Sequence, residues 1–513
     1  MGLFSLASEQ PWLPALLVAV PYVIYKIQAY RKLSAFKGPP GSGWFELWHI
    51  TAWLGNNSHL KFKEVCDKYG VIARVGPNDL VTSSREVLSQ VNAVRSPYTR
   101  TRWSARMART RNGVDNILSE MNEEIHVRKR HQMAPGYSGK ENRELESTMD
   151  VYIAKFIHLI RSRYLSTPYH VTPFDIGEKT QFLAVDVING IGLGESLGDL
   201  DNDEDRFEYV KQMRLGVRIN SILTSFGFTW VQEIPWIARR LQPKEEDAIG
   251  LGRVLRHCRV RIQERVKRGL SERSDMLASF ARHGLTTEDL VNEVIIQLIA
   301  GADTTSTAIR CLILHVLTHP PVYKKLQDEV DSAVAAGKAP AAPGIITEAA
   351  ARSLPYLQAC IKESLRIHPP LTTTLPKRVP DSGDTVMVDG KPVFLPPGTN
   401  VGYSVYALHR DKRTYGEDVD EFRPERWLLE KDEARLLAMN KTHDMIFGYG
   451  RYQCLGKPIA QMEISKAIFE LMRNFELSLA RPENPWKQEN VLGLFFHEDL
   501  LVHAVDRVQG VTA

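Results

Sequence analysis

The chain has 513 residues, of which 43% are hydrophobic and 25% charged, and its 65 Lys and Arg nearly balance its 61 Asp and Glu for a formal net charge of +4. This composition is that of a globular protein with a large core, and it excludes a mostly disordered, collagen-like or polytopic membrane protein. So small a net charge gives no reason to expect nucleic acid as the main partner.

The first part of the chain is nearly free of charge, because from Leu3 to Tyr25 the only charged residue is Glu9. Its length is near the lower limit of about 17 to 25 residues for a membrane-spanning helix, and we predict a single-pass membrane anchor over residues 1–35. Basic residues follow, and they are expected to keep residues 36–513 on the cytoplasmic side; they are Lys26, Arg31, Lys32 and Lys37. A cleaved signal peptide and a buried amphipathic helix are the alternatives.

The body that follows has mainly helical patterns. Residues 38–43, Gly-Pro-Pro-Gly-Ser-Gly, predict a hinge between the anchor and the body. Apolar residues recur every four positions in several stretches, for example at Leu145, Met149 and Ile153. Strand patterns are short and late, where Thr385–Val388 and Val393–Leu395 flank an Asp-Gly turn. We therefore predict a mainly α body with a small β region.

One predicted helix is unusually long. It begins near Thr286, which forms a capping pair with Asp289, and it ends at His319 before two prolines. These limits give about 33 residues, or roughly 50 Å of helix. The segment 291–302 is apolar on nearly every side, which predicts burial through the centre of the protein. Polar and small residues interrupt it at Gly301, Asp303 and Thr304, and they indicate either a functional site or a polar network that fixes helix packing.

A loop near the C-terminus contains one of the five scattered cysteines. Residues 447–456 read Phe-Gly-Tyr-Gly-Arg-Tyr-Gln-Cys-Leu-Gly and precede an amphipathic helix over 459–472. The glycines allow close approach of a flat group, and the helix N-terminus stabilises a thiolate. A lone cysteine does not suit structural zinc, which needs four ligands. An inert or nucleophilic cysteine stays possible, and a thiolate on haem iron fits the loop best.

Five motifs in order resemble those of one family, the cytochrome P-450 haem-thiolate monooxygenases. The loop matches the family's Phe-x-x-Gly-x-Arg-x-Cys-x-Gly signature, and Ala300–Thr305 matches the oxygen-activating segment of its central helix. The other three matches are the Glu-x-x-Arg motif, the segment of a second arginine and a propionate-binding helix, at Glu363–Arg366, Phe422–Trp427 and His126–Arg130. The resemblance implies a cytochrome P-450 fold with one large haem domain behind the anchor. The segments 131–140 and 452–458 resemble fungal microsomal members of the pisatin-demethylase-like subgroup.

The resemblance assigns a role to each matching residue. Cys454 would be the metal ligand to haem b (heme b, iron protoporphyrin IX), Asp303 and Thr304 would relay protons, and Gly301 would leave room beside the ring. The other expected haem contacts are in the cysteine loop and at the propionates: Phe447, Gly450, Gly456, His126, Arg130 and Arg378. The expected buried ion network consists of Glu363, Arg366 and Arg426. One position departs from the family, because Tyr452 stands where an arginine or histidine is usual, so the resemblance does not carry the family's ion pair with a propionate over to this position.

Electrons must come from outside the chain, because it carries no flavin or nicotinamide fingerprint. The resemblance implies an NADPH-dependent flavoprotein reductase on the same membrane, the endoplasmic reticulum, with docking candidates at Arg128, Lys129 and Lys457. The expected substrate is a lipophilic small molecule of fungal secondary metabolism, because the segments expected to line the pocket are mainly apolar; these are 95–116, 214–228, 294–298, 371–374 and 494–496.

Two other functions are compatible with these motifs. A reductase-independent haem-thiolate isomerase or dehydratase would need no proton relay, so the Asp303-Thr304 pair argues against it. A non-catalytic haem-binding sensor or carrier would bind oxygen without consuming it.

Overall fold

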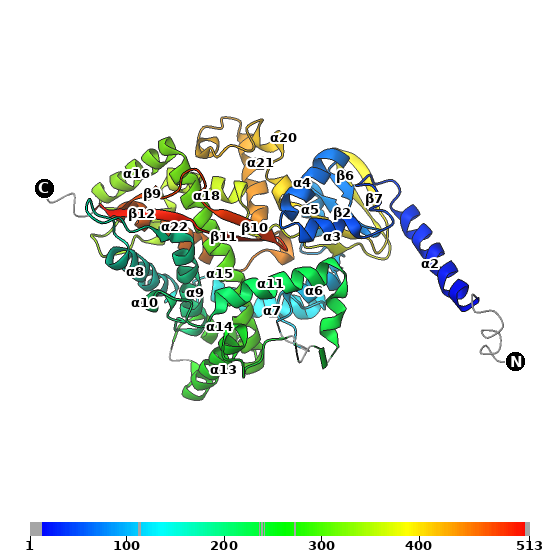
Figure 1. Cartoon of the computed structure of the whole chain (residues 1–513), viewed down its shortest axis with the longest axis horizontal. Coiled ribbons are helices and arrows are strands. Elements are labelled where there is room, and N and C mark those ends of the chain that lie inside the picture. Colours follow the sequence, from blue (N-terminus) through cyan, green and yellow to red (C-terminus); the bar gives the residue numbers. More distant parts are fainter. Residues whose placement is uncertain are drawn as a thin grey trace.

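Helices make up most of the fold, and the longest, α15 (Thr287–Thr318), runs through its middle (Figure 1). The computed structural model describes residues 13–110, 114–234, 236–237, 240, 242–270 and 273–507. The prediction of a mainly α body with a small β region is confirmed.

The limits of α15 follow from its sequence. Thr286 and Asp289 form the predicted capping box, in which the Thr286 hydroxyl accepts from the Asp289 amide and the Asp289 carboxylate accepts from the Thr286 amide. The helix is buried from Leu290 to Leu298 and again from Thr305 to Val316. Between these stretches its surface is partly accessible, and the polar residues noted above lie in that gap.

Several of the other helices pack directly on α15, namely α9, α13, α14, α16, α18 and α22. In chain order the helices are α2 (Leu13–Lys32), α3 (Leu47–Leu54), α4 (Ser58–Tyr69), α5 (Arg85–Val91), α6 (Arg102–Ala108), α7 (Glu123–Tyr137), α8 (Leu145–Arg163), α9 (Ile176–Leu193), α10 (Asp199–Asn202), α11 (Tyr209–Ser225), η1 (Phe228–Glu233), α13 (Gly250–Arg268), α14 (Met276–Arg282), α16 (Pro320–Ala335), α17 (Glu348–Arg352), α18 (Pro355–Ile367), α19 (Val405–Leu408), α20 (Lys412–Tyr415), η3 (Pro424–Trp427), α21 (Glu433–Asp444), η4 (Met445–Phe447), η5 (Gly450–Tyr452) and α22 (Lys457–Asn474).

The strands form four small sheets. The largest has the order β1 (Ile72–Arg74), β2 (Asp79–Thr82), β8 (Asn400–Tyr403), β5 (Lys377–Arg378), β3 (Thr99–Arg100), and only its β2–β8 pair is parallel. A second joins β4 (Phe174–Asp175), β12 (Leu501–Asp506) and β9 (Phe475–Leu479). The two hairpins are β6 (Asp384–Val388) with β7 (Lys391–Leu395), and β10 (Lys487–Val491) with β11 (Leu494–Glu498).

The hairpin of β6 and β7 is the one that the sequence predicts. Val388 pairs with Lys391, so Asp389 and Gly390 are the two turn residues, and both have positive φ values (49° and 75°). Two consecutive left-handed residues form a turn whose twist matches the strands, which is why an Asp-Gly pair occurs there.

The main core lies between α8, α9, α15 and α22. Leu145, Met149 and Ile153 are buried in it, as their spacing predicts. Gly190 lets α8 and α9 approach closely, because a Cβ there would lie 2.2 Å from the Tyr152 ring.

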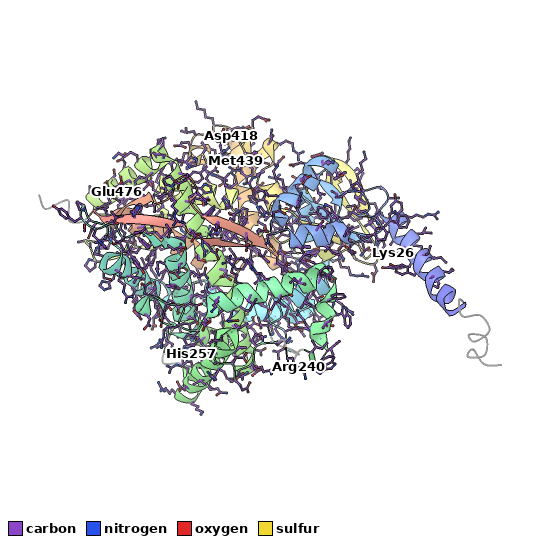
Figure 2. All side chains as sticks on the ribbon, viewed as in Figure 1. Lys26, Arg240, His257, Asp418, Met439 and Glu476 are labelled. Atoms are coloured by element: carbon purple, nitrogen blue, oxygen red, sulfur yellow. The ribbon has the colours of Figure 1, made fainter. Side chains whose placement is uncertain are left out.

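Helix α2 projects from the end of the body that holds the largest sheet, and Lys26 lies on this projecting part (Figures 1 and 2). Within the described residues, no helix is both long enough and apolar enough to cross a membrane. Residues 1–12 of the predicted anchor lie outside the described ranges, so the anchor stays a prediction.

The prediction of a hinge at residues 38–43 is wrong. Ser42 and Gly43 are buried, and a Cβ at Gly38 would lie 1.9 Å from the Arg74 carbonyl oxygen, so this segment packs closely on β1. Arg74 is 3% exposed, and its guanidinium donates to five backbone carbonyls at 2.7–3.1 Å, those of Ala29, Tyr30, Gly43, Gly76 and Pro77. The prolines and glycines therefore fit the chain around an arginine that fastens the end of α2 to the sheet.

We expect Arg74→Met to destabilise the protein by about 3 kcal/mol, because it removes a charged donor and leaves several buried carbonyls without a partner. Urea unfolding followed by circular dichroism measures this change, and limited proteolysis should show faster cleavage near Lys37. Arg85→Met is the control, since Arg85 pairs with its exposed neighbour Glu86, and its effect should stay within about 0.5 kcal/mol. Equal stability of the two variants would contradict this role of Arg74.

Candidate active site

The cysteine loop is a compact turn that delivers Cys454 to the start of α22. The Cys454 amide donates to the Phe447 carbonyl at 2.7 Å and closes the loop. Gly450 has a φ of 59°, and a Cβ there would lie 2.1 Å from the Asn92 carbonyl oxygen, so glycine is required at this close approach to the end of α5. The Cys454 side chain is exposed, whereas the other four cysteines are buried.

The surroundings of the Cys454 sulfur act on its charge in two opposite directions. Although the side chain is accessible, the chain packed around it desolvates the thiol and raises its pKa, while the backbone amides of Gly456 and Lys457 and the charge of Arg130 lower that pKa. These amides belong to the first turn of α22, where the helix dipole also stabilises negative charge. The site therefore suits a thiolate whose own partner is a metal ion.

Three buried basic side chains form a second part of the site, which we call the cationic cluster: Arg100, His126 and Lys377. Arg100 donates to the Ile117 and Glu120 carbonyls and lies 3.1 Å from His126 Nε2. Burial and then Arg100 lower the pKa of Lys377 well below its usual value, and burial and the surrounding arginines lower the pKa of His126 to about 3. Glu123 and Glu120 are the carboxylates that act on Arg100. An anion bound beside His126 and Lys377 would raise their pKa values again, so the cluster suits an anionic ligand.

Tyr452 lies within this cluster and does not replace the usual arginine directly. Its hydroxyl donates to the Glu123 carboxylate, and its ring stacks on His126 with centroids 5.3 Å apart. The Lys377 ammonium lies 3.3 Å from the centre of the Tyr452 ring. Through its ring, Tyr452 therefore orients His126 and Lys377. Its hydroxyl is bonded to Glu123 and does not take the place of the usual arginine.

His126 and Arg130 lie four residues apart on α7. The Arg130 charge lowers the pKa of both His126 and the Cys454 thiol, so the two predicted residues belong to one site. The structure does not bring Arg378 to them. The Arg378 side chain is 51% exposed and pairs with Asp381 at 3.0 Å, whereas its neighbour Lys377 points inward. Successive side chains of a strand point to opposite faces, so Lys377 of β5 takes the buried place that the sequence analysis assigned to Arg378. The sequence analysis missed Lys377 for this reason, and it missed Arg100, which carries no motif.

On α15, the Thr304 hydroxyl donates to the carbonyl four residues earlier, Ala300, at 2.7 Å. Asp303 accepts a hydrogen bond from Gln181 of α9 at 2.8 Å. Gly301 has a packing reason, since a Cβ there would lie 3.0 Å from Ile188 of α9. The expected space beside the ring at Gly301 stays a prediction.

The expected ion network assembles around the Glu363 carboxylate, which is fully buried. Arg366 donates to both of its oxygens at 2.8 and 2.9 Å, and Arg426 donates to Oε1 at 2.7 Å. The Trp427 indole donates to Oε2 at 2.9 Å. The network joins α18 to η3, so its visible role is to hold two segments of the fold together.

Comparisons with known proteins agree with this site. A sequence profile of the cytochrome P450 family matches residues 39–504. Cytochrome P450 monooxygenase ABA1 of Pyricularia oryzae is 36% identical over 507 residues, which cover 97% of each chain. Cytochrome P450 monooxygenase aba1 of Botryotinia fuckeliana is 31% identical over 466 residues, 90% of this chain and 89% of the relative. A cytochrome P450 monooxygenase of Aspergillus terreus is 28% identical over 482 residues, 91% and 95% of the two chains.

The chain therefore belongs to the cytochrome P450 family and is a monooxygenase of that family. The family implies haem, and the residues present fit it. Cys454 offers a sulfur supported by two amides, and the cationic cluster offers buried positive groups that suit the propionates. His126 Nδ1 is buried and has no hydrogen-bond partner among the described residues, which agrees with a missing acceptor or donor there.

We predict that Lys377→Met accelerates haem loss about tenfold, since it removes a buried positive charge, worth roughly 1.4 kcal/mol, from the propionate side. Transfer of haem to apomyoglobin measures the loss rate. Arg378→Met is the matched control, because this neighbouring residue faces solvent and pairs with Asp381. Faster haem loss in the Arg378 variant than in the Lys377 variant would contradict the assignment.

Proposed function

We propose that this cytochrome P450 is a haem-thiolate monooxygenase that inserts one oxygen atom from O2 into a lipophilic small molecule of fungal secondary metabolism. The observation that carries the proposal is the place of the Cys454 sulfur just before α22, where the Gly456 and Lys457 amides and the Arg130 charge favour its thiolate form. When bound there, haem supplies oxygen activation, for which a thiolate ligand favours cleavage of the O–O bond.

The residues of the chain then have distinct tasks. Cys454 would hold the iron, and the cationic cluster with Arg130 would hold the propionates. Asp303 would exchange protons, and the Thr304 hydroxyl, now bonded to Ala300, would hold a hydrogen-bonded group near the oxygen. Glu363, Arg366 and Arg426 would keep the cysteine side of the site in place.

We propose that the body lies against the endoplasmic reticulum membrane, facing the cytosol behind a single-pass anchor. Supporting this, α3 and α11 contact each other and, with the neighbouring loops, carry large exposed apolar side chains. They are Trp44, Phe45, Leu47, Leu54, Leu215, Ile219, Ile222, Phe226, Phe228 and Trp230. A patch of this kind suits the surface of a lipid bilayer.

An NADPH-dependent flavoprotein reductase would supply the electrons. Of the three basic docking candidates, Arg128 is exposed, while Lys457 is bonded to Asp444 at 2.9 Å. Lys129 is unsuitable, because it is mostly buried and bonded to Asp289, Glu293 and the Asp115 carbonyl. Arg128 is therefore the better candidate for contact with an acidic partner.

The substrate would lie where several distant apolar segments meet. Leu371 forms a β-bridge with Leu494, so two of the expected pocket segments are adjacent. Val294 and Leu298 are buried on α15, and α11 contacts β10. Residues 111–113 of the first expected segment lie outside the described ranges. The mainly apolar character of these segments supports a lipophilic substrate.

The reduced protein with carbon monoxide should give a strongly red-shifted Soret band, which Cys454→Ala should lose because no thiolate then binds the iron. An absorption difference spectrum measures this. An unshifted band in fresh, active protein would overturn the proposal. Turnover that needs no NADPH would instead favour the isomerase or dehydratase, and reduced haem that binds O2 without consuming it would favour the sensor or carrier.

Microsomes of a host expressing the full chain should retain the protein after an alkaline carbonate wash, since a spanning helix is not extracted by charge or pH. Protease added to intact microsomes should digest the body, because it faces the cytosol. A resident lumenal protein is the control for vesicle integrity. Release by the carbonate wash would contradict the spanning anchor, and protection of the body would contradict its orientation.

A further inference from the structure

Asp303 ends a chain of buried polar side chains that links α15 to α9. Gln181 Nε2 donates to Asp303 Oδ1 at 2.8 Å, and Gln181 Oε1 accepts from Ser306 Oγ and from Arg310 Nη2, both at 2.5 Å. Gln181, Ser306 and Arg310 are all at most 6% exposed. No sequence motif marks Gln181 or Arg310, and the family resemblance gives neither of them a role.

The bonding partners fix the orientation of the Gln181 amide. Arg310 can only donate hydrogen bonds, so the oxygen of the amide must face it. The NH2 group then faces Asp303 and requires an acceptor there, which an ionised carboxylate provides at either oxygen. Arg310 thus determines, through Gln181, how Asp303 is held.

The charge of Arg310 also favours the ionised form of Asp303, as the Gln181 hydrogen bond does. No carboxylate lies within ion-pair distance of Arg310 in the described part of the chain, and the groups that act on its charge from further away are the Cys311 thiol and the Asp303 and Asp175 carboxylates. Burial raises the pKa of Asp303, whereas the Arg310 charge and the Gln181 hydrogen bond oppose this rise. On the side of α11, the buried Tyr209 hydroxyl also faces the charge of Asp303.

The second oxygen of Asp303 is different from the first. Oδ2 is buried and has no hydrogen-bond partner among the residues that the structure describes. We propose that Gln181, held by Arg310, is a positioning residue that fastens Asp303 through Oδ1 and leaves Oδ2 to accept a proton and pass it on.

This inference rests on the proposed monooxygenase function, in which each O2 takes up two electrons from NADPH and two protons, and one oxygen atom leaves as water. If a proton arrives late or at the wrong place, the same two electrons and two protons leave with O2 as H2O2. A displaced Asp303 should therefore lower the yield of product per NADPH and raise the yield of H2O2.

The test uses the holoenzyme with Gln181→Leu and Gln181→Glu. The first variant removes the donor, and the second replaces it with a carboxylate that would pair with Arg310 and repel Asp303. Infrared spectra across pH follow the C=O band of protonated Asp303, identified as the band lost in Asp303→Asn. We expect its midpoint to rise by about one pH unit in Gln181→Leu and further in Gln181→Glu, with more H2O2 per NADPH in the same order.

Thr180→Val is the matched control, because Thr180 is a buried neighbour on α9 whose hydroxyl donates to the Gly177 carbonyl and, within the described ranges, to no other group. It should move neither the Asp303 midpoint nor the H2O2 yield. An unchanged midpoint and H2O2 yield in both Gln181 variants, with the red-shifted carbon monoxide band intact, would overturn the positioning role alone. Absence of the red-shifted band in the wild-type protein would instead overturn the proposed function.

Discussion

The buried Glu363 carboxylate accepts five hydrogen bonds, and the path of the chain toward Cys454 depends on them. Arg366 supplies two, and Arg426, the Trp427 indole and the Arg423 amide supply the others. Arg366 extends the network to the carbonyls of His409, Val419 and Glu421. An irregular segment of chain is thus held to α18 by one charge, since a buried carboxylate is stable only when its lone pairs are used.

Other buried cations divide into two groups by their partners. Arg74 and Arg366 are saturated by carbonyls or a carboxylate and serve the fold. Lys377 and Arg310 lack an ion-pair partner within the described residues, and both lie where the site meets the core. Because an uncompensated buried charge is costly, such groups mark places where the fold gives up stability for binding or for proton transfer.

Local patterns predicted much of this arrangement. The ends of α15, the β6–β7 hairpin, the Cys454 loop and the Glu363 network each depend on residues close together in sequence or on a known motif. The sequence did not show that Lys377, and not Arg378, points into the site. Strand β5 has only two residues, so which of them faces inward depends on its neighbours in the sheet. The Gln181–Asp303 bond joins residues 122 positions apart, which no periodicity reports.

The hydrogen bonds between Arg74 and the end of α2 limit which amino-acid substitutions this part of the protein can accept. The five acceptors around Arg74 are main-chain oxygens, which every residue type provides, so the side chains of residues 29, 30 and 77 matter little to the bonds themselves. Residues 43 and 76 are more restricted, because a Cβ at Gly43 would lie 2.8 Å from the Tyr30 ring and one at Gly76 would lie 2.9 Å from Asp79. The donor side has no such latitude, because only a guanidinium offers five N–H groups in a fixed plane. Substitutions are therefore better tolerated at most of the acceptor positions than at Arg74, and the orientation of α2 relative to the body depends mainly on this one side chain.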